Sequence, residues 1–215
     1  GTDETGVPGL ILGGVGIVVI ILACAAAHWI SWHRPRALQY ATRRLVEGLM
    51  GVALDPMAPR AQLSREDVSP HLWPNGKLPT SAEWLHLADE DFHGYRLKVH
   101  GLVENPVELS MDEIRALGKQ EQTTIHHCIQ GWSGVASWGG LPLSRLVELV
   151  RPTPEARFVV FRSFGEGLHG GEYYDCHSLT NVLHPQSLLA YERNGSPLER
   201  LHGAPLRLRV ENQLG

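Results

Sequence analysis

An apolar run near the N-terminus constrains this chain more than any other feature of its sequence. Residues 7–27 contain no charged side chain and consist mainly of Val, Ile, Leu, Ala and Gly. About 20 such residues in a helix, each adding about 1.5 Å, cross the roughly 30 Å hydrocarbon core of a bilayer. Trp29 and Trp32 follow the run, as in the aromatic belt at a membrane surface. The sequence therefore predicts a single-pass transmembrane anchor over residues 1–33.

The charges on either side of this run predict its orientation. Asp3 and Glu4 precede it, and four arginines follow it between residues 34 and 44. A cleavable signal peptide has the opposite arrangement, with its positive charges ahead of the apolar stretch. Because basic flanks stay on the cytoplasmic side of a membrane, the pattern predicts a cytoplasmic location for everything after residue 33.

A second segment separates the predicted anchor from the rest of the chain. Between residues 34 and 66 apolar residues recur at helical spacing in an Arg-rich stretch, and the breaker Asp55-Pro56-Met57-Ala58-Pro59 follows. This pattern is typical of a juxtamembrane helix followed by a linker. Residues 67–215 are enough for one hydrophobic core, so we expect a single domain there.

The composition argues against two classes of protein. A net charge of −4 with a pI near 6.3 provides no excess of the basic residues with which proteins follow nucleic-acid phosphates. No nucleic-acid partner is therefore expected. The three cysteines, Cys24, Cys128 and Cys176, are far apart, and Cys24 lies inside the apolar run. For this reason no disulfide framework is predicted.

Short strands and short helices alternate irregularly after residue 67. Ser110, with Glu113 three residues later, is typical of the N-terminus of a helix. The expected strands are 95–101, 122–128, 157–162 and 205–211, the expected helices are 110–117 and 143–150, residues 131–140 are expected to be turn-rich, and residues 178–190 are expected to be partly helical. Because no regular strand-helix-strand rhythm is present, the pattern predicts an α+β fold.

Cys128 is the cysteine best placed for chemistry. It ends a predicted strand and precedes a loop rich in Gly and Trp, and loops after strands often carry functional residues. From the residues alone, three other interpretations stay open. A lone cysteine is commonly a small buried apolar residue. His126 and His127 could make it part of a zinc site or of a Cys-His nucleophile pair, although no CxxC partner and no orienting Asn or Asp can be named.

Three separated strings in the domain resemble the sulfite-oxidase-type molybdopterin oxidoreductases. They are His127-Cys-Ile-Gln-Gly-Trp-Ser-Gly134, Leu189-Ala-Tyr-Glu-Arg-Asn-Gly195 and His202-Gly-Ala-Pro-Leu-Arg207, in the order in which the family has them. The resemblance covers residues 68 to 215. It implies the mixed-sheet molybdopterin-binding fold of that family and a Mo-molybdopterin cofactor.

The resemblance also implies a role for each matching residue. The family cysteine at the position of Cys128 ligates molybdenum through its thiolate, a soft ligand that suits this metal. Cys128 is thus expected to be the metal ligand at the catalytic centre. Asn75 matches an asparagine that contacts the pterin, and Ser163 matches a hydroxyl residue beside the cofactor. His202 and Arg207 match residues that hold the phosphate end, where arginine offers a rigid fork of donors.

The chain departs from the family pattern at two places. One family feature is kept, because Tyr173 or Tyr174 occupies the position of an active-site tyrosine. The first departure is at Pro74, which replaces the arginine that helps sulfite oxidases to hold their anionic substrate. The family also continues after the position of Gly215 into a segment with a phosphate-binding lysine. The sequence is therefore expected to lack the C-terminal end of the domain, and true sulfite oxidation is not expected.

These features together predict a membrane-anchored, molybdopterin-dependent oxidoreductase. The resemblance implies two-electron oxygen-atom transfer on a small or protein-bound S-oxide, N-oxide or oxyanion substrate. The missing arginine favours reduction over oxidation as the direction of the reaction. The substrates would then be S- or N-oxides, and a membrane redox partner would supply the electrons. An alternative from another class is a membrane-tethered scaffold that keeps the fold without the cofactor.

Overall fold

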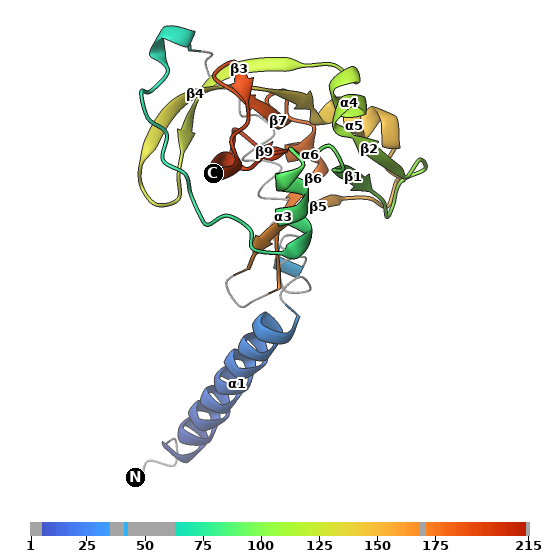
Figure 1. The fold of residues 1–215 in the computed structure, drawn as a ribbon. Helices are drawn as coiled ribbons and strands as arrows, with labels where there is room; N and C mark the ends of the chain where they lie inside the picture. Colours follow the sequence, from blue (N-terminus) through green and yellow to red (C-terminus); the bar gives the residue numbers. More distant parts are fainter. Residues whose placement is uncertain (1–5, 35–40, 43–62, 168–170, 214–215) are drawn as a thin grey trace. The chain divides into compact units, whose positions relative to one another are not determined.

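The computed structural model describes residues 6–34, 41–42, 63–167 and 171–213 (Figure 1). The chain divides into two compact units, Gly1–Gly48 and Leu49–Gly215. Most of the predicted juxtamembrane helix and linker, residues 34–66, lies outside the described residues. The division into an anchor, a linker and a catalytic domain from residue 67 therefore stays a prediction.

The first unit contains one long helix, α1 (Gly6–His33). Its segment Gly14–His33 is long and apolar enough to cross a membrane, judged by length and composition. The aromatic side chains near its C-terminal end are exposed, and the ring of Trp29 stacks on His33 with 4.9 Å between centroids. Such rings are typical of a membrane interface.

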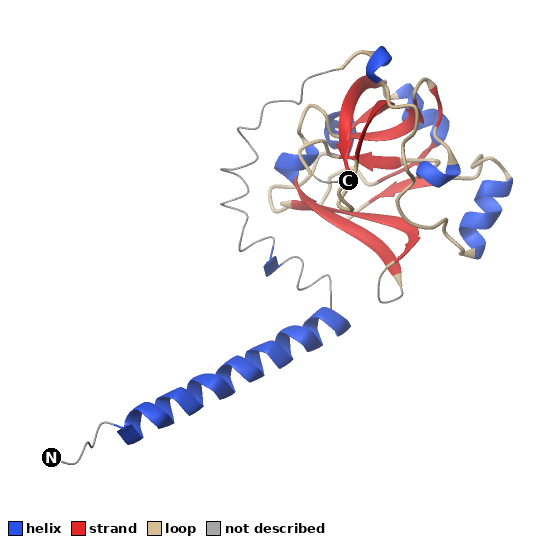
Figure 2. Cartoon of the chain, turned by 90° about the vertical axis from the view of Figure 1, so that its left-hand side faces the viewer, coloured by secondary structure: helices blue, strands red, loops and turns tan. Residues whose placement is uncertain are grey.

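The second unit is built from three antiparallel sheets with short helices between them (Figures 1 and 2). The two outer sheets are the pairs β1-β2 and β5-β6, and the central sheet has the order β3-β4-β7-β8, with β9 also paired to β7. The elements are η1 (Arg65–Asp67), α3 (Ala82–Asp89), β1 (Arg96–Val99), β2 (Val107–Ser110), α4 (Met111–Ala116), β3 (Gln120–His127), β4 (Ser133–Pro142), α5 (Leu143–Val150), β5 (Phe158–Glu166), β6 (Glu172–Ser178), α6 (Leu179–Val182), β7 (Leu188–Arg193), β8 (Ser196–Pro197), η2 (Arg200–His202) and β9 (Arg207–Arg209).

This mixture of antiparallel sheets and short helices confirms the predicted α+β class. Strands β1, β3, β5 and β9 and helices α4 and α5 lie where the sequence predicts them. Helix α4 begins as expected, because the Ser110 hydroxyl accepts from the Glu113 backbone N–H at 3.3 Å while the Glu113 carboxylate accepts from the Ser110 N–H at 2.7 Å. The two bonds satisfy donors that a helix start leaves unpaired.

One prediction from local sequence was wrong. Residues 131–140 are not turn-rich: the turn is confined to residues 128–132, and β4 begins at Ser133. Its glycines are poor strand formers, but a Cβ on Gly140 would collide with the Leu189 backbone, so the close β4-β7 pairing requires glycine there. The prediction for residues 178–190 is confirmed, because the segment is partly helical: α6 covers Leu179–Val182, and β7 begins at Leu188.

The central sheet carries the parts of the chain that form the site. β3 pairs with β4 along its whole length, from Gln120 opposite Gly140 to His127 opposite Ser133. β7 pairs with β4 along one edge and with β9 along the other, where Arg207 lies opposite Ala190. The contact of Arg209 with His126 also brings β9 near the residues just before Cys128.

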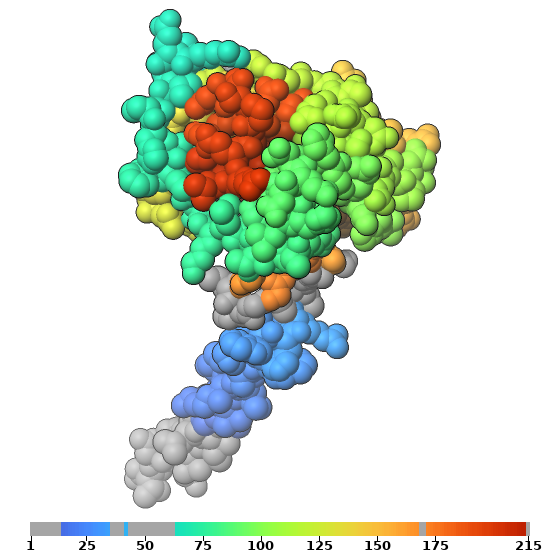
Figure 3. Space-filling model, viewed as in Figure 1, coloured from blue at the N-terminus to red at the C-terminus, as the bar shows by residue number. Residues whose placement is uncertain are grey.

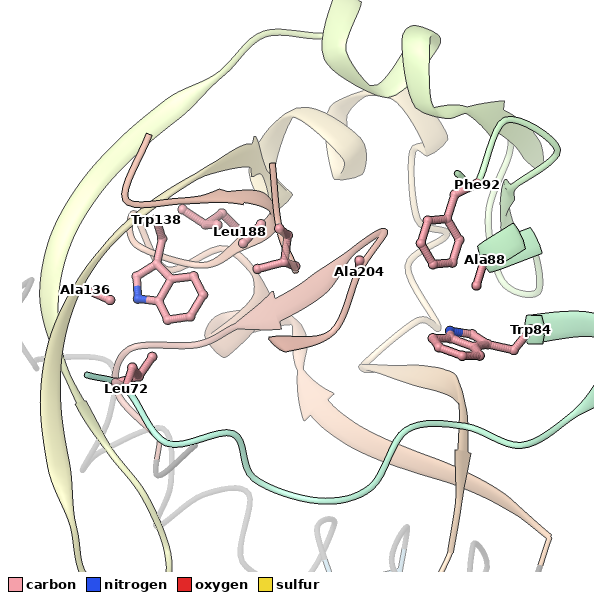
Figure 4. Packing of buried hydrophobic residues seen from close by; sticks show 10 residues of the cluster. Leu72, Trp84, Ala88, Phe92, Ala136, Trp138, Leu188 and Ala204 are labelled. Carbon is pink, nitrogen blue, oxygen red and sulfur yellow. The ribbon is translucent and has the colours of Figure 1, made fainter. Parts of the chain in front are cut away.

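Two hydrophobic clusters support these sheets. One, drawn in Figure 4, places Trp138 beside Leu72 and Leu188, and gathers Trp84 and Phe92 near α3. The second lies around α4, α5 and β7 and consists of Ile114, Leu141, Leu143, Leu146, Val150, Val182, Leu189 and Tyr191. Trp138 is fully buried, and its indole also faces the charged residues described next.

Candidate active site

Cys128 lies at the tip of the β3-β4 hairpin. Its N–H donates to the Trp132 carbonyl at 2.9 Å, and the Gly131 N–H donates to the Cys128 carbonyl at 3.0 Å. Gly131 has a φ of +90°, a conformation that glycine adopts without a steric penalty. The cysteine is 4% exposed while the neighbouring Ile129 is 76% exposed. The thiol is therefore held in a tight turn just beneath the surface.

Asn75 contacts this thiol directly. Its side-chain Nδ2 donates to Sγ of Cys128 at 3.3 Å. The segment before it is tied to β4, because Ser69 and Val135 exchange two hydrogen bonds of 3.0 and 2.9 Å. A cysteine sulfur is a soft ligand for metals, and this hydrogen bond helps to fix its position. The structure thus brings two of the predicted site residues together; a contact of Asn75 with a pterin stays a prediction.

A group of basic side chains lies near Cys128, which we call the basic cluster: Arg193, Arg207, Arg209, His126 and His202. Arg207 Nη1 donates to the His202 carbonyl at 3.2 Å. The guanidinium carbons of Arg207 and Arg209 lie 5.1 and 4.7 Å from the centre of the Trp138 ring, within reach of a cation–π interaction. Figure 3 shows the C-terminal residues, in red, between the teal segment that contains Asn75 and the green region that contains α3.

Arg209 is the centre of a buried polar network. Its Nε and Nη2 donate to Oε1 of Glu211 at 3.1 and 2.7 Å, and its Nη1 lies 2.6 Å from Nδ1 of His126. Gln122 adds a donor to the same Glu211 oxygen at 3.2 Å. Because the side chains of Arg209 and Glu211 are 5% and 1% exposed, these bonds join β9 to β3 away from water.

Burial and neighbouring cations lower the pKa values of several members of the cluster. Burial lowers the pKa of Arg207 to about 10, and the nearby Arg209 and Arg193 add to this effect, against the opposing pull of the Cys128 thiol. Burial, followed by Arg209, lowers the pKa of His126 to about 3. Burial also lowers the pKa of His202. His126 is therefore neutral at physiological pH.

The cluster also contains donors without acceptors. Arg193 pairs with Glu199 at 2.7 Å and Arg209 with Glu211 at 2.7 Å, but within the described part of the chain Arg207 pairs with no carboxylate. Two buried N–H donors, Trp138 Nε1 and Arg193 Nε, have no hydrogen-bond partner among the described residues, and neither has the buried His126 Nε2. Since unpaired buried polar groups are rare in native proteins, this arrangement fits an anionic ligand rich in acceptors. The phosphate and pterin of molybdopterin meet that description, and the Cys128 thiol meets the need of its metal for a soft ligand.

The other predicted residues lie on the β5-β6 hairpin. The Ser163 hydroxyl accepts from the Gly165 N–H at 2.9 Å, within its own hairpin. Tyr173 is 54% exposed, and Tyr174 is half-buried opposite Arg162. Thr80 Oγ1 donates to Glu166 at 2.9 Å, which ties this hairpin to the segment after Asn75. Roles for Ser163, Tyr173 and Tyr174 at the active site stay predictions.

The sequence analysis did not identify three residues of this arrangement as part of a site: Arg193, Arg209 and Trp138. It also did not predict the contact of His126 with Arg209. The sequence offered one indication for His126. It lies two positions before Cys128, and residues two positions apart point to the same side of an extended chain. The zinc interpretation receives no support from geometry, since no group of three or more His, Cys, Asp or Glu side chains among the described residues is arranged to hold a metal ion.

Comparison with known proteins places this site in a family. Residues 85–215 match the model of the oxidoreductase molybdopterin-binding domain. The chain is 33% identical over 125 residues to YedZ1 of Azospira oryzae, named as a protein-methionine-sulfoxide reductase subunit, with 58% of this chain and 45% of YedZ1 covered. It is 34% identical over 149 residues to the oxidoreductase YuiH of Bacillus subtilis, with 66% and 72% covered.

A third relative is the protein-methionine-sulfoxide reductase catalytic subunit MsrP of Xanthomonas axonopodis. It is 32% identical over 131 residues, with 56% of this chain and 41% of MsrP covered. The chain thus spans less than half the length of YedZ1 and MsrP. The family match nevertheless extends over more than half of the chain and includes Cys128, His202 and Arg207. The chain belongs to the family of oxidoreductases with a molybdopterin-binding domain.

Proposed function

We propose that this chain forms the cofactor-binding part of a molybdenum enzyme that reduces sulfoxides by two-electron oxygen-atom transfer. The observation that carries the proposal is the juxtaposition of the Cys128 thiol, bonded by Asn75 at 3.3 Å, with a cluster in which Arg207 has no carboxylate partner in the described chain. A thiol and an uncompensated cation are what a metal-dithiolene cofactor with a terminal phosphate requires.

Each of these residues has a distinct task in the proposed site. When bound, molybdopterin supplies the redox chemistry at its metal; the protein supplies orientation and electrostatics. Cys128 would ligate the metal, and the Asn75 amide would orient the sulfur through its hydrogen bond. Arg207 and His202 would hold the phosphate through charge and hydrogen bonds. Cys128 itself is buried, which keeps bulk water away from the sulfur.

Two observations support reduction of a sulfoxide rather than oxidation of sulfite. Pro74 stands directly before Asn75, where an arginine for an anionic substrate would be expected. MsrP and YedZ1 bear the names of protein-methionine-sulfoxide reductase components. The proposed reaction takes up two electrons and two protons, cleaves the S=O bond and yields a thioether and water.

The apolar helix supports a role at the membrane. We propose that α1 spans the bilayer with its basic flank, and hence the second unit, on the cytoplasmic side, and that a membrane redox partner supplies the electrons. Protease accessibility in sealed vesicles of known orientation tests this placement. Cleavage of the second unit only from the periplasmic face would contradict it.

The first test of the enzyme proposal is the cofactor itself. The chain is produced in a host that makes molybdopterin, and molybdenum and released oxidised pterin are measured. About one of each per chain is expected, together with dye-linked reduction of methionine sulfoxide and no oxidation of sulfite. A protein with neither molybdenum nor pterin would favour the scaffold alternative, and a loaded protein that oxidises sulfite would reverse the proposed direction.

A further inference from the structure

A buried histidine beside the proposed metal ligand has one ring nitrogen without a partner. His126 lies two residues before Cys128, and the two side chains are 1% and 4% exposed. Nε2 of His126 has no hydrogen-bond partner among the described residues. The ring of Trp132 lies 5.4 Å from the His126 ring between centroids, and an indole provides no lone-pair acceptor. A nitrogen so deeply buried requires an explanation.

Arg209 determines which nitrogen of this ring carries the proton. A guanidinium donates hydrogen bonds and never accepts them, so Nδ1 of His126, 2.6 Å from Arg209 Nη1, must be the acceptor. The proton of the neutral ring is therefore on Nε2. Glu211 accepts from the other side of the same guanidinium and fixes its plane. The ring is held firmly at Nδ1 and presents an N–H donor at its opposite edge.

This donor belongs to the same arrangement as the proposed cofactor contacts. His126 continues the strand alternation that leads to Cys128, so both side chains face one side of the hairpin. Trp138 Nε1 and His202 Nδ1, also buried, lack partners as well. We propose that His126 is a further cofactor-binding residue, whose Nε2–H donates to an acceptor atom of molybdopterin, and that Arg209 is its positioning residue. This inference rests on the proposed function, because it requires molybdopterin in the site.

Two substitutions separate the roles of the two ring nitrogens. In His126→Asn the amide oxygen can take the position of Nδ1, which keeps an acceptor for Arg209 and removes the donor. In His126→Gln the amide nitrogen can take the position of Nε2, which keeps the donor. The adjacent His127 provides a matched control, since its Nδ1 is bonded to the Ser133 hydroxyl at 2.8 Å on the neighbouring strand.

The readouts are cofactor release and cofactor-dependent stability in the full chain. Protein loaded in a molybdopterin-producing host is gel-filtered, and the loss of molybdenum and pterin is followed with time; Tm is measured with and without cofactor. We expect His126→Asn to release the cofactor about tenfold faster, the effect of one hydrogen bond to a bound ligand. The Tm of its cofactor-free form should match the wild type. His126→Gln and His127→Gln should release the cofactor at the wild-type rate.

Three results would overturn the inference. Equal release from wild type and His126→Asn shows that Nε2 contributes no contact. An equal fall in Tm of the loaded and cofactor-free His126→Asn proteins shows a packing role alone. A wild-type chain that holds neither molybdenum nor pterin overturns the proposed function as well, so the failure of the inference and the failure of the function can be distinguished.

Discussion

Two groups of basic side chains in the second unit differ in how their charge is balanced. In the outer group, Lys119 lies 2.7 Å from Glu121 and 2.6 Å from Glu192, and Arg65 lies 2.7 Å from Glu121. Hydrogen bonds with these carboxylates raise the pKa of Lys119 and lower that of Glu121, so each group stabilises the charge of the other. In the basic cluster, burial and neighbouring cations instead lower the pKa of Arg207 to about 10.

The opposite directions of these shifts distinguish a structural network from the proposed binding site. The outer group is at least partly exposed and contains its own carboxylates, so it needs no ligand. The basic cluster holds Arg207 and several buried donors without matching acceptors. Strongly shifted pKa values with an unpaired charge are typical of functional sites. The comparison predicts that substitutions in the cluster change cofactor binding, and that substitutions in the outer group do not.

The largest effect is expected at the thiol beside the cluster. Cys128→Ser removes the soft ligand but keeps the backbone bonds of the turn to Gly131 and Trp132. Turnover should fall to the level of the metal-free protein while the circular dichroism spectrum is unchanged. Cys24→Ser, in the apolar helix, is the control and should keep full activity. An active, molybdenum-loaded Cys128→Ser protein would contradict the assignment of Cys128 as the metal ligand.

The next largest effect is expected on stability. Arg209→Met leaves the Glu211 carboxylate buried without its partner, which typically costs about 3–5 kcal/mol of the free energy of unfolding. Urea denaturation of the cofactor-free chain measures this loss. The double variant Arg209→Met/Glu211→Leu removes both charges and should regain most of it. A single variant as stable as the wild type would contradict the expected cost of leaving the Glu211 carboxylate without its cationic partner.

A substitution at Arg207 should act on the ligand and not on the fold. Arg207→Gln removes a cation that has no carboxylate partner in the described chain, so the cofactor-free protein should unfold at the same Tm or a higher one. Cofactor affinity should fall by about 10- to 100-fold, as for a lost hydrogen bond to a charged group. Competition of wild type and variant for limiting molybdopterin measures the ratio. A lower Tm with unchanged affinity would make Arg207 a structural residue.

The smallest effect is expected in the outer group. Lys119→Met should cost about 0–1 kcal/mol, as for other exposed ion pairs, and the loss should shrink in high salt. Because the fold lowers the pKa of Glu121, its contribution to stability is present above the pKa of the unfolded chain and is lost as the pH falls through the lowered value. Lys119→Met should weaken this acid dependence. Loss of molybdopterin in this variant would contradict the distinction between the outer group and the basic cluster.

Local signals explain which parts of the fold could be predicted. The Ser110-Glu113 pair began helix α4 as expected, and the alternating segment 122–128 formed β3, because both depend on side chains a few residues apart. β4 escaped prediction, since its Gly134, Gly139 and Gly140 disfavour a strand when read locally. It is a strand because β3 and β7 pair with it on both edges.

The site divides in the same way. Family motifs located Cys128 and Arg207, and the structure adds the bond from Asn75 to the thiol, which joins residues 53 positions apart. The contact of Arg209 with His126 joins residues 83 positions apart and belongs to no motif. A histidine next to a histidine and an arginine in an alternating strand carry no local sign of such a contact.

The sequence alone determined the apolar helix, the position of Cys128 at the end of a strand and the family to which the chain belongs, because each of these depends on residue types at short spacing. The tertiary structure decided which charges are balanced. Pairing of β9 with β7 brings Arg209 to Glu211 and His126, and leaves Arg207 over Trp138 without a carboxylate in the described chain. Whether a buried cation is neutralised depends on distances and on exclusion of water, and both arise only when the sheet is assembled.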